Sequence, residues 1–239
     1  MPRSLHESTI NRTFTRRRFL EATGVVTLGA ALGPVWGRAF ADEAGPMIKR
    51  YRTLGRTGFE VGDISMGCGS IAESNVVRYA YDHGINLFDT AESYGNGDSE
   101  TKIGEAMPHM QRDKIFIVTK LVLEDDPDQQ NLVERFNACL GRLKTDYVDA
   151  LYCHAIADLK MVEAGPFLAA CDQLKPEGKL KHAGISRLGP RGEEPDAMDT
   201  VLIKAAEVGH YDVMLLSYGF VNAEEGERVL KACKEKNIG

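Results

Sequence analysis

Three short apolar runs in this sequence are each followed directly by a residue that can take part in acid–base chemistry. Asp89, Lys120 and His154 occupy these positions, and Tyr94 lies five residues after Asp89 in a loop rich in Gly, Ser and Asn. The apolar runs are residues 86–88, 115–119 and 148–153. The carboxyl ends of neighbouring parallel strands meet at one edge of a sheet, so such strands would bring all four side chains to one rim.

The four residue types suit the protonation of a carbonyl group that is receiving a hydride. A free tyrosine has a pKa of about 10. A nearby lysine cation stabilises the phenolate, which makes the phenol a usable acid near neutral pH. A carboxylate beside the lysine keeps it charged and oriented, and an imidazole can donate to a carbonyl oxygen as negative charge develops there. Each residue alone has an ordinary structural explanation, but together the four match one reaction.

This set of four residues and its placement resemble the catalytic tetrad of the aldo/keto reductases. The similar segments are residues 51–69, 86–100, 147–154 and 184–186, and the resemblance runs from about residue 49 to residue 239. It implies reduction of an aldehyde or ketone by NAD(P)H. In that reaction Tyr94 would be the general acid, Lys120 and Asp89 would support it, and His154 would orient the small carbonyl substrate.

The resemblance also implies a nicotinamide cofactor, NADP or NAD. Ser186 matches the family serine that hydrogen-bonds the nicotinamide carboxamide, and Arg187 follows it where many members have asparagine. Gly67 and Asp89 complete the expected cofactor contacts. The basic residues that hold the adenosine 2′-phosphate in the family follow its eighth strand, so the choice of NADP over NAD is expected from resemblance alone.

A different dinucleotide-binding fold is a competing interpretation. Residues 67–72 fit the pattern G-x-G-x-x-A, and Asp89 lies 20 residues after Gly69, which is the spacing of a Rossmann ribose carboxylate. The following helix is predicted to begin near Asn75, which is late for that motif. The Rossmann interpretation also leaves the other three chemistry-bearing residues without a role. Both interpretations predict a nicotinamide nucleotide and hydride transfer.

The periodicity after residue 50 predicts six β/α units in a row, preceded by a hairpin that turns near Gly55 and Gly58. The first strand is predicted over 63–66. Alternating strands and helices indicate an α/β fold, either an open doubly wound sheet or a (β/α)8 TIM-type barrel. The family resemblance favours the barrel, which would need two more units. We therefore expect an incomplete barrel over 50–239, after a linker over 42–49.

The first 41 residues have the features of a signal peptide. Residues 15–20 match the twin-arginine export pattern, 22–36 are mildly apolar, and 39–41 form an A-x-A cleavage site. This predicts the twin-arginine export machinery as a partner and a periplasmic or extracytoplasmic location. The apolar run is shorter than a membrane helix requires, so no stable membrane association is expected after cleavage. The alternative is a disordered basic tail on a cytoplasmic protein.

Charge and cysteine content limit the remaining function classes. The net charge is −6, and the part after the basic N-terminus is acidic, which gives no support for nucleic-acid binding. The five cysteines are scattered without a C-x-x-C pair or zinc spacing, so we expect buried thiols and no metal site. Two alternatives to the enzyme remain: a non-catalytic subunit that binds the nicotinamide nucleotide or senses redox state, and an inactive truncated product.

Overall fold

The computed structural model describes residues 48–124, 126–163, 165–188 and 196–239. The chain divides into two units, 1–44 and 45–239, and the described residues all belong to the second. The predicted signal peptide, its cleavage site and most of the linker therefore lie outside the described residues. In the ranges that the structure describes, no helix is both long and apolar enough to cross a membrane.

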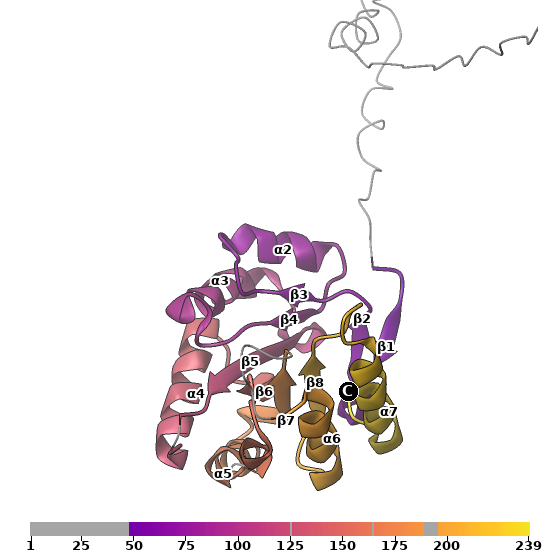
Figure 1. Cartoon of the computed structure of the whole chain (residues 1–239). Helices are drawn as coiled ribbons and strands as arrows, with labels where there is room; N and C mark the ends of the chain where they lie inside the picture. The colour runs from indigo at the N-terminus through magenta and orange to yellow at the C-terminus, as the bar shows by residue number, and fades with distance from the viewer. Residues whose placement is uncertain (1–47, 125, 164, 189–195) are drawn as a thin grey trace, which may run out of the picture. The chain divides into compact units, whose positions relative to one another are not determined.

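Six parallel strands form a curled sheet in which each strand lies beside the next one along the chain (Figure 1). They are β3 (Met66–Gly67), β4 (Leu87–Asp89), β5 (Phe116–Val122), β6 (Val148–His154), β7 (Leu180–Arg187) and β8 (Val213–Leu216). A doubly wound sheet reverses its strand order partway, and this sheet does not. The sheet is a half-barrel that matches an incomplete TIM barrel, as the sequence predicted. The Rossmann interpretation is wrong.

Helices follow the strands in the predicted alternation. They are α2 (Ser74–Asp82), α3 (Asp98–Ala106), α4 (Gln129–Leu143), α5 (Gly165–Leu174), α6 (Met198–Val208) and α7 (Ala223–Lys236). The 3-10 turn η1 (Gly55–Thr57) precedes all of these helices. Four more such turns lie between the helices: η2 (Tyr94–Gly97), η3 (Met107–His109), η4 (Arg112–Lys114) and η5 (Leu159–Glu163). α2 begins two residues after the G-x-G-x-x-A segment ends, so that segment does not open a helix.

Both faces of the sheet carry buried apolar side chains, and other parts of the chain pack against each face. The larger cluster packs helix residues such as Phe136 and Phe167 against the strands. The smaller cluster contains Phe116 and Tyr152, and Phe59 of the N-terminal hairpin packs against it. The Phe59 and Phe116 rings lie edge to face at 5.5 Å. Strands covered on both faces are continuous apolar runs in sequence, which is why the β5 and β6 regions were recognisable.

The hairpin consists of β1 (Tyr51–Thr53) and β2 (Glu60–Gly62), paired antiparallel as predicted. The prediction of a strand over 63–66 is wrong, since β3 comprises only Met66–Gly67. The Asp63 amide donates to the Arg50 carbonyl at 3.1 Å, so Asp63 continues the hairpin pairing. The hairpin and the first barrel strand follow each other too closely for residue patterning to separate them.

All five cysteines are free and buried, as expected. Burial raises the pKa of Cys68 to about 12, and it raises the pKa of Cys171 to about 12 as well. A thiol that stays protonated is a poor nucleophile and a poor metal ligand. These cysteines therefore act as small core residues.

Two helical glycines provide a matched test of how α3 and α4 pack. A Cβ on Gly104 of α3 would lie 2.1 Å from the Arg142 carbonyl oxygen, whereas a Cβ on Gly141 of α4 would meet nothing within 4 Å. We expect Gly104→Ala to lower the free energy of unfolding by about 1–3 kcal/mol because the helices must separate. Gly141→Ala should raise it by about 0.4–1 kcal/mol. Urea denaturation of both variants checks this, and equal effects would contradict the packing.

Candidate active site

The carboxyl ends of the strands form one rim that carries the predicted site residues. Gly67 pairs with Asp89 across β3 and β4, and Val122 pairs with His154 across β5 and β6. Cys153 pairs with Ile185, so Ser186 continues the row on β7. The parallel register thus brings residues that are distant in sequence to the same edge.

Lys120 is at the centre of the site. Its ammonium Nζ donates to Asp89 Oδ1 at 2.5 Å, to the Thr90 carbonyl oxygen at 2.7 Å and to the Tyr94 hydroxyl at 3.4 Å. The Lys120 side chain is fully buried, and the Asp89 side chain is 17% exposed. The structure therefore brings together the carboxylate, the ammonium and the phenol that the sequence predicted.

The ion pair is held in surroundings with little water. Burial raises the pKa of Asp89, because desolvation penalises the carboxylate, while the Lys120 cation opposes that rise. An ammonium that is fully buried needs a nearby anion to remain charged. Asp89 is placed to do this, and the Thr90 carbonyl accepts a second hydrogen bond from the same ammonium.

Tyr94 and His154 meet edge to face. Their ring centroids are 5.7 Å apart with an interplanar angle of 81°, and His154 is 7% exposed. On another side, the Tyr94 ring lies against Gly69, where an added Cβ would stand 3.7 Å from the ring. The phenol is partly open to solvent, with Lys120 beside it. All four predicted residues thus lie close together.

The loop after Tyr94 is bent by a run of left-handed backbone. Gly95, Asn96 and Gly97 have φ values of 59°, 53° and 89° before α3 begins at Asp98. At Gly97 an added Cβ would lie 2.6 Å from the Arg142 side chain. Left-handed backbone favours glycine and asparagine, which explains the Gly and Asn content of this loop.

Hydrogen bonds connect the first turn of α3 to β5 and to the residues that follow β3 and β4. The Ser99 hydroxyl lies 2.7 Å from the Thr90 hydroxyl and donates to the Cys68 carbonyl at 2.7 Å. Glu100 accepts from the Thr119 hydroxyl at 2.5 Å and from Arg142 Nε at 2.6 Å. These contacts fix the residues that adjoin Lys120 and Asp89. The sequence offered no signal for them beyond ordinary polar residues in a helix.

Ser186 and Arg187, the expected cofactor residues on β7, are buried beside the end of β6. The Ser186 hydroxyl accepts from the Ala155 amide at 3.0 Å and donates to the Cys153 carbonyl at 3.3 Å. Arg187 donates to the carbonyls of Ile156 at 2.5 Å and Asp196 at 2.7 Å. Both therefore organise the loop that follows His154. Their contact with a cofactor stays a prediction.

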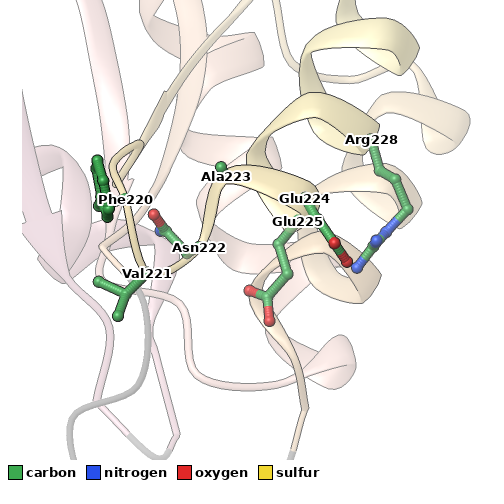
Figure 2. A pocket seen from close by; sticks show the side chains of 7 residues that line it. All are labelled: Phe220, Val221, Asn222, Ala223, Glu224, Glu225 and Arg228. Carbon is green, nitrogen blue, oxygen red and sulfur yellow. The ribbon is translucent and has the colours of Figure 1, made fainter.

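A hollow of about 380 Å³ lies beside the loop between β8 and α7 (Figure 2). Phe220, Val221 and Asn222 line one side, and Glu225 and Arg228 of α7 line another. None of the four tetrad residues lines it. The hollow follows the carboxyl end of β8 but is not part of the site that the tetrad residues form.

The fold and the rim together define a class of protein: an incomplete β/α barrel with Asp89, Lys120 and His154 toward the carboxyl ends of its strands. The sequence model of the protein family described as "Aldo/keto reductase family" matches residues 72–239, which is more than half of the chain. The chain belongs to this family.

Similar proteins agree with this membership. "Probable aldo-keto reductase 1" from Glycine max is 27% identical over 205 residues, covering 78% of this chain and 56% of that protein. "L-galactose dehydrogenase" from Arabidopsis thaliana is 31% identical over 207 residues, covering 79% and 62%. The chain thus spans little more than half the length of these curated relatives.

Solved structures share the fold. The aldo-keto reductase from Klebsiella pneumoniae in complex with NADPH has a TM-score of 0.63 and 26% identity, with 80% of this chain and 66% of that chain covered. An aldo-keto reductase from Bacillus halodurans in its holo form has a TM-score of 0.65 and 24% identity, with 80% and 64% covered. Because the Bacillus halodurans protein is only 24% identical, its similarity to this chain is one of fold alone.

Proposed function

We propose that this chain reduces an aldehyde or ketone to an alcohol with NADPH or NADH. One observation carries the proposal: the buried Lys120 ammonium lies between the Asp89 carboxylate at 2.5 Å and the Tyr94 hydroxyl at 3.4 Å. A phenol beside a held cation can give up its proton to a developing alkoxide. A structural ion pair alone would not need a partly exposed phenol beside it.

The four residues have separate roles in the proposed reaction. Tyr94 transfers its proton to the carbonyl oxygen, and Lys120 stabilises the phenolate that remains. Asp89 keeps Lys120 charged and oriented. His154, whose ring meets the Tyr94 ring in a T-shaped contact, orients the carbonyl and stabilises charge on its oxygen.

The rim has features that fit a nicotinamide nucleotide, which would supply the hydride when bound. An added Cβ on Gly67, opposite Asp89, would meet nothing within 4 Å, so there is open space next to the tetrad. We assign cofactor contacts to Gly67, Asp89, Ser186 and Arg187. NADP is the preferred form, since the Klebsiella pneumoniae relative is in complex with NADPH.

Export through the twin-arginine machinery, with a periplasmic or extracytoplasmic location, is part of this proposal and rests on the sequence of residues 1–41 alone. A protein exported in the folded state can bind its cofactor before it leaves the cytoplasm. Peptide mapping that identifies the N-terminal residue of the protein recovered from the periplasm tests the export proposal. We expect the mature protein to begin near Asp42.

Isotope transfer tests the proposed function directly. The full chain is incubated with cofactor deuterated at the nicotinamide C4 position and with a panel of aldehydes and ketones. We expect deuterium on the carbonyl carbon of at least one product, because hydride transfer moves that atom without exchange with water. Tight cofactor binding with no transfer to any carbonyl would contradict the proposal.

A non-catalytic subunit on the same scaffold is the second candidate. A protein from Arabidopsis thaliana named "Probable voltage-gated potassium channel subunit beta" is 34% identical over 121 residues, covering 44% of this chain and 37% of that protein. The candidate is supported by this similarity, because part of this chain resembles part of a protein that is named a subunit. Binding of cofactor without deuteride transfer would favour this candidate.

A further inference from the structure

An ion pair next to the Tyr94 loop has no part in the proposed proton transfer. Glu92 lies in that loop, and Arg135 lies on α4. Arg135 Nε donates to Glu92 Oε2 at 3.1 Å, and Arg135 Nη2 donates to Oε1, so the contact is bidentate. The Glu92 side chain is 17% exposed, and the Arg135 side chain is 23% exposed. A planar guanidinium that binds both oxygens of a carboxylate fixes its orientation as well as its position.

The pair attaches the loop to the end of β5, next to Lys120. The Val122 amide donates to Glu92 Oε1 at 3.4 Å, and Arg135 Nη2 donates to the Val122 carbonyl at 2.8 Å. The Glu92 amide donates to the Lys120 carbonyl at 3.3 Å. Glu92 precedes Tyr94 by two residues, and Val122 follows Lys120 by two residues. The same contacts therefore link the strand that holds the ammonium to the loop that holds the phenol.

We propose that Glu92 and Arg135 are positioning residues that set the separation between the Tyr94 hydroxyl and the Lys120 ammonium. This inference rests on the proposed function. Asp89 and Lys120 are held by strands, whereas Tyr94 lies in a loop with left-handed backbone after it. The phenol–ammonium contact of 3.4 Å is also longer than the carboxylate–ammonium contact of 2.5 Å. The position of the phenol thus depends on how the loop is attached.

Variants of Arg135 test the attachment in the full chain. Arg135→Met keeps much of the side-chain volume and removes the guanidinium, and Arg135→Lys keeps the charge but cannot bind both oxygens. We expect kcat to fall about 10- to 100-fold in Arg135→Met and less in Arg135→Lys, because misplacing a reacting group by about 1 Å can cost about 100-fold. The KM for the cofactor should stay within about two-fold.

Two further variants distinguish the positioning role of the Glu92–Arg135 pair from a general loss of stability. The double variant Glu92→Gln/Arg135→Met should be no slower than the worse single variant, since residues of one interaction are not additive. Arg228→Met is the control for the loss of an arginine ion pair elsewhere, because Arg228 forms a single contact at 2.7 Å with Asp199 between α7 and α6. It should leave kcat unchanged.

Hydrogen exchange of the backbone amides over 92–97 gives a readout that does not require activity. We expect faster exchange there in Arg135→Met and unchanged exchange in Arg228→Met. Unchanged exchange over 92–97 in Arg135→Met, or a kcat equal to that of the wild type, would overturn the positioning role. A wild-type chain that reduces no carbonyl would instead overturn the proposed function, and the exchange rates would still decide whether the pair holds the loop.

Discussion

The variant Tyr94→Phe is expected to lose nearly all reductase activity while it keeps its cofactor affinity. Removal of the hydroxyl takes away the proton donor and the acceptor of the 3.4 Å hydrogen bond from Lys120, while the phenylalanine ring can still pack against Gly69 and His154. General acid catalysis contributes about 10²- to 10⁴-fold, so kcat should fall by that factor. Steady-state kinetics and cofactor titration by fluorescence quenching measure the two quantities separately.

Tyr79→Phe is the matched control for this substitution. Tyr79 lies on α2 with 64% of its surface exposed, and its ring stacks on His83 at 4.0 Å. The same chemical change there should leave kcat unchanged. It should alter the free energy of unfolding by no more than about 0.5 kcal/mol. Activity retained in Tyr94→Phe would remove Tyr94 from the mechanism and with it the proposed role of Lys120.

The convergence of Asp89, Lys120 and His154 could be predicted because each follows an apolar run in the sequence. Asp89 and His154 are the last residues of β4 and β6, and Lys120 lies two residues before the end of β5. Strands buried on both faces are continuous apolar runs, and parallel neighbours end at one rim, so strand ends are the positions that patterning fixes best. The two-residue strand β3 could not be placed in this way. It is too short to show a period, and the preceding Asp63 pairs with the hairpin.

The surroundings of the tetrad could not be predicted for a different reason. Lys120 binds the Thr90 carbonyl, and Tyr94 packs on Gly69, but a backbone carbonyl or a glycine has no side-chain signal. Glu92 and Arg135 do carry charged side chains, yet they are 43 residues apart in a chain with many acids and bases. Only the folded geometry selects which of these meet.

The variant Lys120→Met is expected to lose activity and to lose stability in a pH-dependent way. Without the ammonium, no cation stabilises the phenolate, and kcat should fall about 10²- to 10³-fold. The variant also leaves the Asp89 carboxylate uncompensated in a site where its partner is fully buried. Breaking a buried pair on one side costs about 3–5 kcal/mol, which we expect near neutral pH.

The direction of the pH dependence follows from Asp89. Burial already raises the pKa of Asp89, with Lys120 opposing the rise, so loss of the cation raises the folded-state pKa further above the ordinary value of 3.8. Protonation of Asp89 then favours folding at low pH, and that contribution is lost as pH rises through the folded-state pKa. The difference in melting temperature between Lys120→Met and the wild type should therefore be smaller at acidic pH than at neutral pH.

The double variant Asp89→Leu/Lys120→Met separates stability from catalysis at this site. Replacing both members of a buried ion pair by apolar residues is often neutral or stabilising, so the double variant should melt above Lys120→Met at neutral pH. The melting temperature of the double variant should also lack the pH dependence that Asp89 gives to Lys120→Met, because the titrating carboxyl is gone. Activity should not return, since the ammonium that stabilises the Tyr94 phenolate is still missing. A double variant that regained reductase activity along with stability would show that Lys120 acts only as a structural partner of Asp89.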